Sequence, residues 1–303
     1  MSLIFEKLPE EYLFYLALSL PFPSLSTLCI TDSHFNQLIY KNEYFWHQKF
    51  LKDHGPLNYL GSWKYLYLTF SNIYVSGDNH FGELGLDDCI SIDHPTQLHG
   101  FKAKQVSCGA IHSAVIDINN YLWTFGYNQF GRLGIGNSVN QMNVPVLVTD
   151  IKVKSVSAGN QNTMFIDFDN NVWGFGANSH GELGLGDFTT RYYPDQIPQL
   201  KAKQVSSGGL HTLVIDLNDN VWAFGLDDAG RLGINTSNHI NVPVPTLIPG
   251  INAKEVAAGY AHSLIIDLND NVWSFGFNGF GQLGLGSDLR AMIWKIELFQ
   301  PRF

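Results

Sequence analysis

The chain has little of what several protein classes require. Its three cysteines, Cys29, Cys89 and Cys108, share no metal-ligand spacing and are a poor number for a disulfide framework. It has no run of eighteen apolar residues, so we expect no membrane span. The apolar stretch from Tyr12 to Phe22 follows glutamates, whereas a secretory signal has a basic start. We therefore expect an intracellular protein of the cytoplasm or nucleus.

Positive charge is also scarce. The chain has 18 Lys and Arg against 27 Asp and Glu, a net charge of -9, and no large basic cluster. A nucleic-acid-binding surface needs such a cluster, so we expect no DNA or RNA partner. The glycine-rich segments lack the Lys and Ser/Thr of a phosphate loop, and no nucleophile–base pair or metal spacing stands out. The sequence predicts no catalytic residue, no cofactor and no metal, hence a protein that is not an enzyme.

The chain does contain one sequence motif in five copies. The lead aromatic residues are 49, 50, 49 and 51 positions apart. A period near fifty with strand-like segments is typical of a β-propeller, and such arrays build binding surfaces more often than catalytic pockets. The copies run over Tyr74–Gly85, Trp123–Gly134, Trp173–Gly184, Trp222–Gly233 and Trp273–Gly284.

A second half of the repeat precedes four of these copies. Alternating apolar residues predict strands in both halves, and Asn- and Asp-rich pairs between them predict hairpin turns. Complete units span about 104–148, 154–198, 203–247 and 254–299, and a partial unit lies before them. The expected fold is mainly β, a propeller of about five four-stranded blades, either closed or open. Unpaired blade edges are a liability, which favours closure.

Histidine recurs at one repeat position, as His112, His211 and His262, with Asn162 in the remaining copy. A ring of histidines could bind a metal, but the copies lie in different blades and Asn replaces one of them. We therefore expect a buried hydrogen-bonding residue beside the axis. The recurrent aspartates are likewise expected to stabilise turns, because catalytic carboxylates must converge in one cleft. They are Asp117, Asp167, Asp216 and Asp267.

These motifs closely resemble the repeats of the regulator of chromosome condensation family over about residues 64–299. The resemblance implies four-stranded blades in a propeller that commonly has seven of them. It also makes nucleotide exchange on a small GTPase a candidate function, because the family is named for that activity. The spacings of 49 to 51 leave no room for a long inserted wedge, which counts against that activity here.

The first sixty residues have a different period and almost no glycine. Helical spacing of apolar residues and N-capping side chains predict three or four short helices. The expected organisation is a helical domain at 1–55, a connector with the start of the first partial blade at 56–71, and propeller repeats at 72–303.

The helical segment resembles an F-box over about residues 5–53. The matching residues are Leu8-Pro9-Glu10, Leu13, Leu16, Leu20, Pro23-Ser24-Leu25, Leu28 and Trp46–Phe50. The resemblance implies that an apolar surface docks on the adaptor subunit of a cullin-RING ubiquitin ligase, and that surface would consist of Leu8, Pro9, Leu13, Leu16, Leu25 and Leu28. The alternative is a helical cap that only covers the first blade.

Three functions follow from these patterns. The first is a non-catalytic substrate receptor of the ubiquitin ligase, in which the propeller holds a target protein. The second is a guanine-nucleotide exchange factor, and the third is a stand-alone protein-interaction scaffold. Target recognition is expected from loops that differ between copies, at 137–143, 188–193, 236–240 and 287–290, although neutral loop variation would look the same.

Overall fold

The computed structural model describes residues 48, 72–234, 240–284 and 294–296. It divides into two compact units, which are described separately. Unit 1 comprises Met1–Val75, Thr96–Lys104 and Asp117–Asn119, and unit 2 comprises Ser76–Pro95, Gln105–Ile116 and Asn120–Phe303. The predicted helical domain at 1–55 lies outside the described residues except for Gln48, which is helical.

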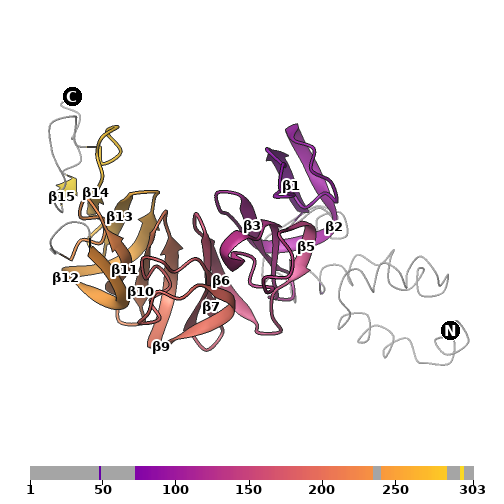
Figure 1. The fold of residues 1–303 in the computed structure, drawn as a ribbon. Helices are drawn as coiled ribbons and strands as arrows, with labels where there is room; N and C mark the ends of the chain where they lie inside the picture. The colour runs from indigo at the N-terminus through magenta and orange to yellow at the C-terminus, as the bar shows by residue number, and fades with distance from the viewer. Residues whose placement is uncertain (1–47, 49–71, 235–239, 285–293, 297–303) are drawn as a thin grey trace, which may run out of the picture. The chain divides into compact units, whose positions relative to one another are not determined.

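Unit 2 holds the repeats as successive antiparallel sheets, which Figure 1 colours from magenta to yellow. We number the blades by repeat, so that blade 2 is 104–148, blade 3 is 154–198, blade 4 is 203–247 and blade 5 is 254–299. Blade 1 is the partial repeat before them. Each complete blade has four strands, and the last strand of blades 3 and 4 runs on into the first strand of the next blade, whereas β5 and β6 between blades 2 and 3 are separate.

The strand bounds show this sharing. β9 (Arg191–Ser207) and β12 (Ile240–Ala258) are 17 and 19 residues long because each serves two blades. β2 (Ile92–Cys108) has the same length as β9. The remaining strands are β1 (Asn72–Gly77), β3 (His112–Asp117), β4 (Leu122–Tyr127), β5 (Gln141–Leu147), β6 (Val153–Ala158), β7 (Asn162–Asp167), β8 (Asn171–Gly176), β10 (His211–Asp216), β11 (Asn220–Asp227), β13 (His262–Asp267), β14 (Val272–Gly276) and β15 (Trp294–Ile296).

The second and third strands of each blade form a tight hairpin. In blade 4, β10 pairs with β11 so that Thr212 lies opposite Phe224 and Ile215 opposite Val221. The turn residues Asn170 and Asp219 adopt left-handed backbone angles, with φ of 64° and 67°. Asn and Asp tolerate this conformation better than most side chains. The predicted hairpin turns are therefore confirmed.

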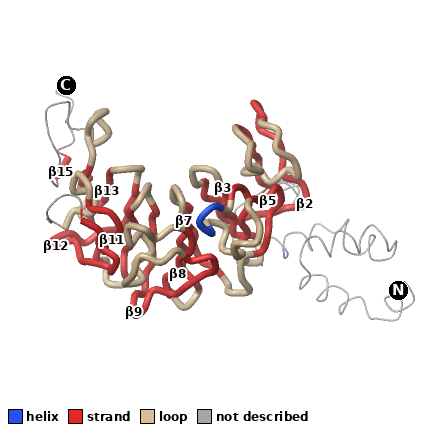
Figure 2. Tube along the Cα trace, in the orientation of Figure 1, coloured by secondary structure: helices blue, strands red, loops and turns tan. Residues whose placement is uncertain are grey.

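Apolar side chains from neighbouring blades pack together in unit 2. One cluster joins Met164 and Ile166 of blade 3 to Val214 and Phe224 of blade 4, and all four side chains are fully buried. The core thus lies between the blades, so each blade depends on its neighbour for burial. Among the described residues the 3₁₀ turn η2 (Gln129–Gly131), blue in Figure 2, is the one helix besides the helical residue Gln48. The prediction of a mainly β chain is confirmed; ring closure stays a prediction.

The described part of unit 1 contributes fewer contacts. Lys102 Nζ donates a hydrogen bond of 2.7 Å to Asn72 Oδ1, and the N–H of Ile118 donates to the Lys102 carbonyl. Burial lowers the pKa of Lys102 to about 8, because a partly dehydrated ammonium group loses solvation. These contacts tie the strand residues of this unit to one another.

Candidate protein-interaction face

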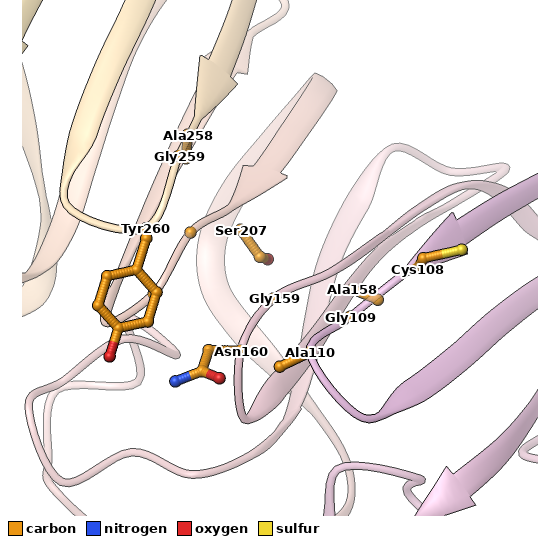
Figure 3. Close-up of a pocket in the computed structure, with 12 residues that line it drawn as sticks. Cys108, Gly109, Ala110, Ala158, Gly159, Asn160, Ser207, Ala258, Gly259 and Tyr260 are labelled. Atoms are coloured by element: carbon orange, nitrogen blue, oxygen red, sulfur yellow. The ribbon is translucent and has the colours of Figure 1, made fainter. Parts of the chain in front are cut away.

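The turns between the first and second strands of blades 2 to 5 meet around one hollow in unit 2. We call them the inner turns. The hollow has a volume of about 280 Å³, and three residues of each turn line it. Figure 3 shows the Asn160 amide and the Tyr260 ring extending from their turns, whereas the glycine positions add no side chain. The lining residues are Cys108–Ala110, Ala158–Asn160, Ser207–Gly209 and Ala258–Tyr260.

Glycine recurs in these turns because the blades approach each other closely. A Cβ built on Gly208 would lie 2.4 Å from the Gly259 carbonyl oxygen, and one on Gly109 would lie 2.6 Å from the Gly159 carbonyl oxygen. Both distances are shorter than van der Waals contact allows. The N–H of Gly209 also donates to the Gly259 carbonyl at 3.2 Å. Any larger residue would push the turns apart and widen the hollow.

The recurrent histidine links one blade to the next. Thr163 Oγ1 donates to the Arg132 carbonyl, so it can accept the proton of His112 Nε2, which lies 2.9 Å away. In blade 4, His211 Nε2 makes the same 2.9 Å bond to Ser263 Oγ. Both rings therefore carry their proton on Nε2, and Nδ1 is an acceptor that has no partner in the structure.

Burial keeps these two rings neutral. His112 and His211 are 1 % and 0 % exposed. Burial, and secondarily the positive charge of Arg132, lowers the pKa of His112 to about 3. Burial, then Arg231 and His262, lowers that of His211 to about 3 as well. The prediction of a buried hydrogen-bonding residue is confirmed for these two positions, whereas His262 in blade 5 is only half-buried.

The loop between the third and fourth strands lies at the same end of each blade as the inner turn. We call it the outer loop. The N–H of Ala177 at the start of the blade 3 loop donates to the Gln161 carbonyl of the inner turn at 2.9 Å. The corresponding bond in blade 4 runs from Leu226 to Leu210, also at 2.9 Å. Inner turns and outer loops therefore build one surface.

A buried asparagine fixes the outer loop in blades 1 to 3. In blade 3, Asn178 is fully buried, its Oδ1 accepts from the N–H of Leu183, and its Nδ2 donates to the Asp187 carbonyl. In blade 2, Asn128 makes the same bracket with the N–H of Leu133 and the carbonyls of Gly136 and Val139. The bracket holds the loop tip in one conformation, because both ends of the amide are used.

Exposed apolar side chains lie on these bracketed loops and near the start of strands β9 and β12. The set, which we call the loop belt, includes Ile90 at 67 % exposure, Phe188 at 51 % and Tyr193 at 66 %. Neighbouring blades touch along it, because the Tyr193 hydroxyl would lie 2.6 Å from a Cβ on Gly136. Exposed apolar patches on folded proteins often mark interaction sites. The belt consists of Ile90, Val139, Phe188, Tyr193 and Val244.

Carboxylates flank the loop belt. Asp87 is exposed three residues before Ile90. Beside Phe188, Asp187 and Asp195 both bond Arg191, at 2.7 and 2.8 Å. The hydrogen bond from Arg191 holds the pKa of Asp187 below its ordinary value. The belt is thus an apolar strip with acidic neighbours, in a chain of net charge -9.

Buried charges lie between the inner turns and outer loops. Arg132 is 2 % exposed, and its guanidinium donates to the carbonyls of Gln129 and Asn160. Glu182 is at the same repeat position in blade 3, where its Oε2 accepts from the N–H of His180 at 2.7 Å. Burial raises the pKa of Glu182, and its Oε1 has no partner in the structure. The sequence analysis singled out the recurring histidines and did not predict that an arginine and a glutamate are buried at this repeat position.

The recurrent aspartates lie at the opposite end of the blades and stabilise turns, as expected. Asp216 Oδ1 accepts from the N–H groups of Asn218 and Asn220, and its Oδ2 accepts from Trp222 Nε1 at 2.9 Å. Burial raises the pKa of Asp216, but the hydrogen bonds from Asn220 and Trp222 outweigh it, so that the pKa is lowered overall. Asp167 and Asp267 make the same bonds to Trp173 and Trp273.

The predicted recognition loops are only partly described. Residues 137–143 and 188–193 belong to the described part of unit 2 and supply Val139, Phe188 and Tyr193 of the loop belt. Residues 236–239 and 287–290 lie outside the described residues, as do all six residues expected to dock on a ligase adaptor. They are Leu8, Pro9, Leu13, Leu16, Leu25 and Leu28.

Two further features are absent from residues 48, 72–234, 240–284 and 294–296. Within those ranges, no group of three or more His, Cys, Asp or Glu side chains is placed to hold a metal ion. Over the same ranges, the structure contains no helix with the length and hydropathy needed to cross a membrane.

Known proteins resemble the chain in its repeats. Residues 60–300 match the RCC1-like domain family. The protein RCC2 homolog of Xenopus laevis is 28 % identical over 227 residues, which cover 74 % of this chain and 40 % of the relative. Human protein RCC2 is 26 % identical, over 77 % of this chain and 41 % of the relative. The chain thus spans about two fifths of these curated relatives.

Solved structures share the fold. Yeast RCC1 (Prp20), determined bound to Kap60, superposes with a TM-score of 0.65 at 21 % identity, over 73 % of this chain and 55 % of that chain. Human WBSCR16 gives a TM-score of 0.65 at 20 % identity, over 75 % and 62 %. At this identity the likeness shows the propeller fold alone.

These relatives correct the expected ligase-receptor function. The two curated relatives described above, which match about three quarters of the chain, are RCC2 proteins, and yeast RCC1 is among the structural matches. The family match begins at residue 60, after the helical segment 1–55 from which the ligase-receptor function was predicted. None of these relatives supports an F-box in residues 1–55. The prediction that the chain is a substrate receptor of a ubiquitin ligase is therefore wrong. From its repeats and their match over residues 60–300, the chain belongs to the RCC1-like domain family.

Proposed function

We propose that the chain is a protein-interaction platform that carries no chemistry of its own and binds its partner through the loop belt. The observation that carries this proposal is the row of exposed apolar residues on bracketed outer loops in consecutive blades. Ile90, Phe188 and Tyr193 are each more than half exposed. Apolar side chains on rigid loops bind with little loss of conformational entropy.

The flanking charges suggest what the partner looks like. Asp87 is exposed beside Ile90, and the Asp187–Arg191–Asp195 group lies beside Phe188. A segment with apolar side chains between lysines or arginines would complement this strip. Such a pairing speeds association and weakens with salt, because exposed charges are screened. The partner is therefore expected to be a protein with a basic, apolar segment.

The hollow between the inner turns offers a second contact on the same surface. Ser207 is 7 % exposed, lines the hollow and has no hydrogen-bond partner for its Oγ. The volume of about 280 Å³ admits one side chain of a bound segment. A segment crossing the outer loops could therefore place one polar side chain in the hollow.

The test uses photo-crosslinking in cells. A photoreactive residue replaces Phe188 in the full chain, and the matched control replaces Phe168, which is 56 % exposed on a hairpin at the other end of blade 3. We expect one protein to crosslink at position 188 and not at 168. The purified partner should then bind the chain, and Tyr193→Ser should weaken binding about tenfold or more. Equal crosslinking at both positions would contradict the proposal.

A second measurement separates the platform from nucleotide exchange. Prp20p from Saccharomyces cerevisiae, whose crystal structure is 20 % identical in sequence to this chain, has binding properties to Gsp1p and histones. The full chain is incubated with a panel of small GTPases loaded with labelled nucleotide. We expect the rate of release to stay at its intrinsic value. Accelerated release would replace the platform with an exchange factor.

A further inference from the structure

The hollow between the inner turns contains a hydroxyl group that the fold does not use. Ser207 is 7 % exposed and lines the hollow, and its Oγ has no hydrogen-bond partner in the structure. Its side chain lies against the inner turn of blade 3, because a Cβ built on Gly159 would be 3.0 Å from Ser207 Cβ. Buried hydroxyls normally have a partner, since an unpaired one is costly. Ser207 therefore points to a ligand that completes its hydrogen bonding.

Neighbouring serines show what a structural hydroxyl does at this end of the blades. Ser157 Oγ accepts from the N–H of Ser207 at 2.9 Å, and Ser206 Oγ accepts from the N–H of Ala258 at 2.9 Å. These hydroxyls join the inner strands of adjacent blades. Ser207 occupies the next repeat position, where blades 3 and 5 have Ala158 and Ala258. The fold therefore does not require a hydroxyl at this position.

The backbone of the inner turns offers acceptors to the hollow. The N–H of Asn160 donates to the Gly208 carbonyl at 3.1 Å, and the N–H of Gly209 donates to the Gly259 carbonyl at 3.2 Å. These N–H groups are thus used. Each carbonyl oxygen has a second lone pair that can still accept a hydrogen bond.

Side chains add donors and apolar surface. The Asn160 amide and the Tyr260 ring extend from their turns in Figure 3, and an amide or a phenol can both donate and accept. The methyl groups of Ala110, Ala158 and Ala258 line the same hollow. A ligand there meets both donors and acceptors beside apolar surface.

The charges around the hollow disfavour an ionic ligand. The twelve described residues that line it include no Asp, Glu, Lys, Arg or His. Behind them, Arg132 donates to the Asn160 carbonyl at 3.1 Å, and Arg231 interacts electrostatically with Tyr260, so a bound cation would be repelled. Neither arginine lines the hollow, so a carboxylate there would face glycine carbonyl oxygens without a bond to either. A neutral group that both donates and accepts is favoured.

We propose that the hollow binds a primary carboxamide, namely the side chain of an asparagine or glutamine in the segment that the loop belt holds. The amide NH₂ donates to glycine carbonyls of the inner turns, and the amide oxygen accepts from Ser207 Oγ. The source of the carboxamide rests on the proposed platform function, whereas the chemistry of the hollow does not.

The first test compares three ligands of nearly the same shape with the full chain. They are benzamide, which is neutral, benzoate, which is negative, and benzamidine, which is positive. Each is titrated into isotope-labelled chain, and the backbone amide signals of Gly208 and Gly259 are followed by NMR. We expect a millimolar Kd for benzamide, as suits so small a ligand, and at least about a tenfold weaker affinity for both charged compounds. Equal binding of the three, preference for a charged compound, or no binding of benzamide to the folded chain would overturn the proposal.

Variants of the full chain locate the site. Ser207→Ala should weaken benzamide binding about fivefold and leave the thermal unfolding midpoint unchanged, because the hydroxyl has no partner to lose. The matched control is Ser155→Ala, which removes another unpartnered hydroxyl that does not line the hollow and should leave binding unchanged. Ala110 is exposed and lines the hollow, so Ala110→Trp should fill it and abolish binding. Full binding to both Ser207→Ala and Ala110→Trp would contradict the assignment.

Two cysteines give an independent measure of occupancy. Cys108 lines the hollow, and both Cys108 and Cys89 are exposed free thiols. Saturating benzamide should slow alkylation of Cys108 in proportion to the fraction of chain bound and leave Cys89 unaffected, as measured by mass spectrometry of each site. Equal rates at Cys108 with and without benzamide would place the ligand outside the hollow and overturn the proposal.

Photo-crosslinking distinguishes a partner's side chain from a free small molecule. A photoreactive residue in place of Tyr260, which is 70 % exposed beside the hollow, should capture the same protein as one at position 188, and benzamide should reduce the capture at 260. Capture at 188 alone, with benzamide binding intact, would overturn the partner's side chain as the source and assign the hollow to a free carboxamide compound. Loss of capture at 188 with intact benzamide binding would instead contradict only the platform function.

Discussion

Two surfaces of unit 2 carry the same groups and differ in the described residues that lie against them. Between blades 4 and 5, His211, Gly233 and the Arg231 carbonyl receive Ser263 and Phe275. On blade 5, no described heavy atom lies within 4 Å of a Cβ built on Gly284, and His262 is only half-buried. Among the described residues, the same groups are thus enclosed at one surface and more open at the other, which fits an array in which each blade depends on its neighbour for burial.

The largest expected contrast concerns the aromatic rings. Phe224→Ala removes a fully buried ring from the interface with Gly184 and leaves a cavity, which should lower the free energy of unfolding by about 3–5 kcal/mol. Phe280→Ala removes a ring that is 92 % exposed and should change it by less than about 0.5 kcal/mol. Urea unfolding followed by tryptophan fluorescence measures both values. A large loss for Phe280→Ala would mean that this ring is covered in solution.

Acid should weaken the covered interfaces through their histidines. Burial lowers the pKa of His112 and His211 to about 3, so below pH 6.5 the unfolded chain takes up protons first. The histidine contribution is complete above about pH 6.5 and is lost as the pH falls towards 3, by about 2 kcal/mol per histidine between pH 6.5 and 5. The measurement is the free energy of unfolding across this range.

The control for this acid effect is His112→Asn with His211→Asn, since Asn162 already fills the position in blade 3. The double variant should show a flatter pH dependence. Groups such as Asp216, whose lowered pKa matters below about pH 4, and Glu182, whose raised pKa acts in the opposite direction, are common to both proteins. An unchanged slope would show that the histidines are not the source.

Alanine substitutions at a matched pair of glycines separate the cost of backbone strain from the cost of overpacking. Gly184 and Gly284 have φ of 69° and 70°, so alanine should cost each about 1 kcal/mol for the left-handed conformation. Gly184→Ala also places its Cβ 2.9 Å from Phe224, and the overpacking should add about 1–3 kcal/mol. Gly284→Ala meets no described atom within 4 Å. Thermal unfolding of the two variants gives the difference, and equal midpoints would mean that Phe224 moves aside without cost.

The sequence predicted the parts of the fold that repeat. Because His112 and His211 recur with an asparagine between them, a buried structural role could be inferred, and the structure places both against a hydroxyl of the next blade. Asp167 and Asp216 recur before Asn-rich turns, and both accept hydrogen bonds from those turns. Repetition reveals such residues because the same packing contacts form in each blade.

The candidate sites could not be predicted in the same way. Variation between copies predicted 188–193 as a recognition loop, but no repeated residue predicts the exposure of Phe188, which follows from how Asn178 holds the outer loop. Blade 5 carries His262 and Gly284 at the positions of His211 and Gly233. What sets it apart is the absence of a described neighbour over Gly284, which only a structure shows.

The smallest expected contrast concerns a side-chain amide. Gln204 Nε2 donates to the Val256 carbonyl at 3.1 Å, and its Oε1 accepts from the Val256 N–H at 3.3 Å. Gln204→Leu leaves both backbone groups of a buried residue without partners and should cost about 1–2 kcal/mol. Glu255 is the repeat counterpart on exposed blade 5, so Glu255→Leu should change stability by less than about 0.5 kcal/mol. Hydrogen exchange at the Val256 amide reports the loss directly, because only Gln204→Leu should accelerate it. Equal protection of Val256 in both variants would show that water replaces the Gln204 amide at no cost, and that the contrast between blade 4 and blade 5 is smaller than their contacts indicate.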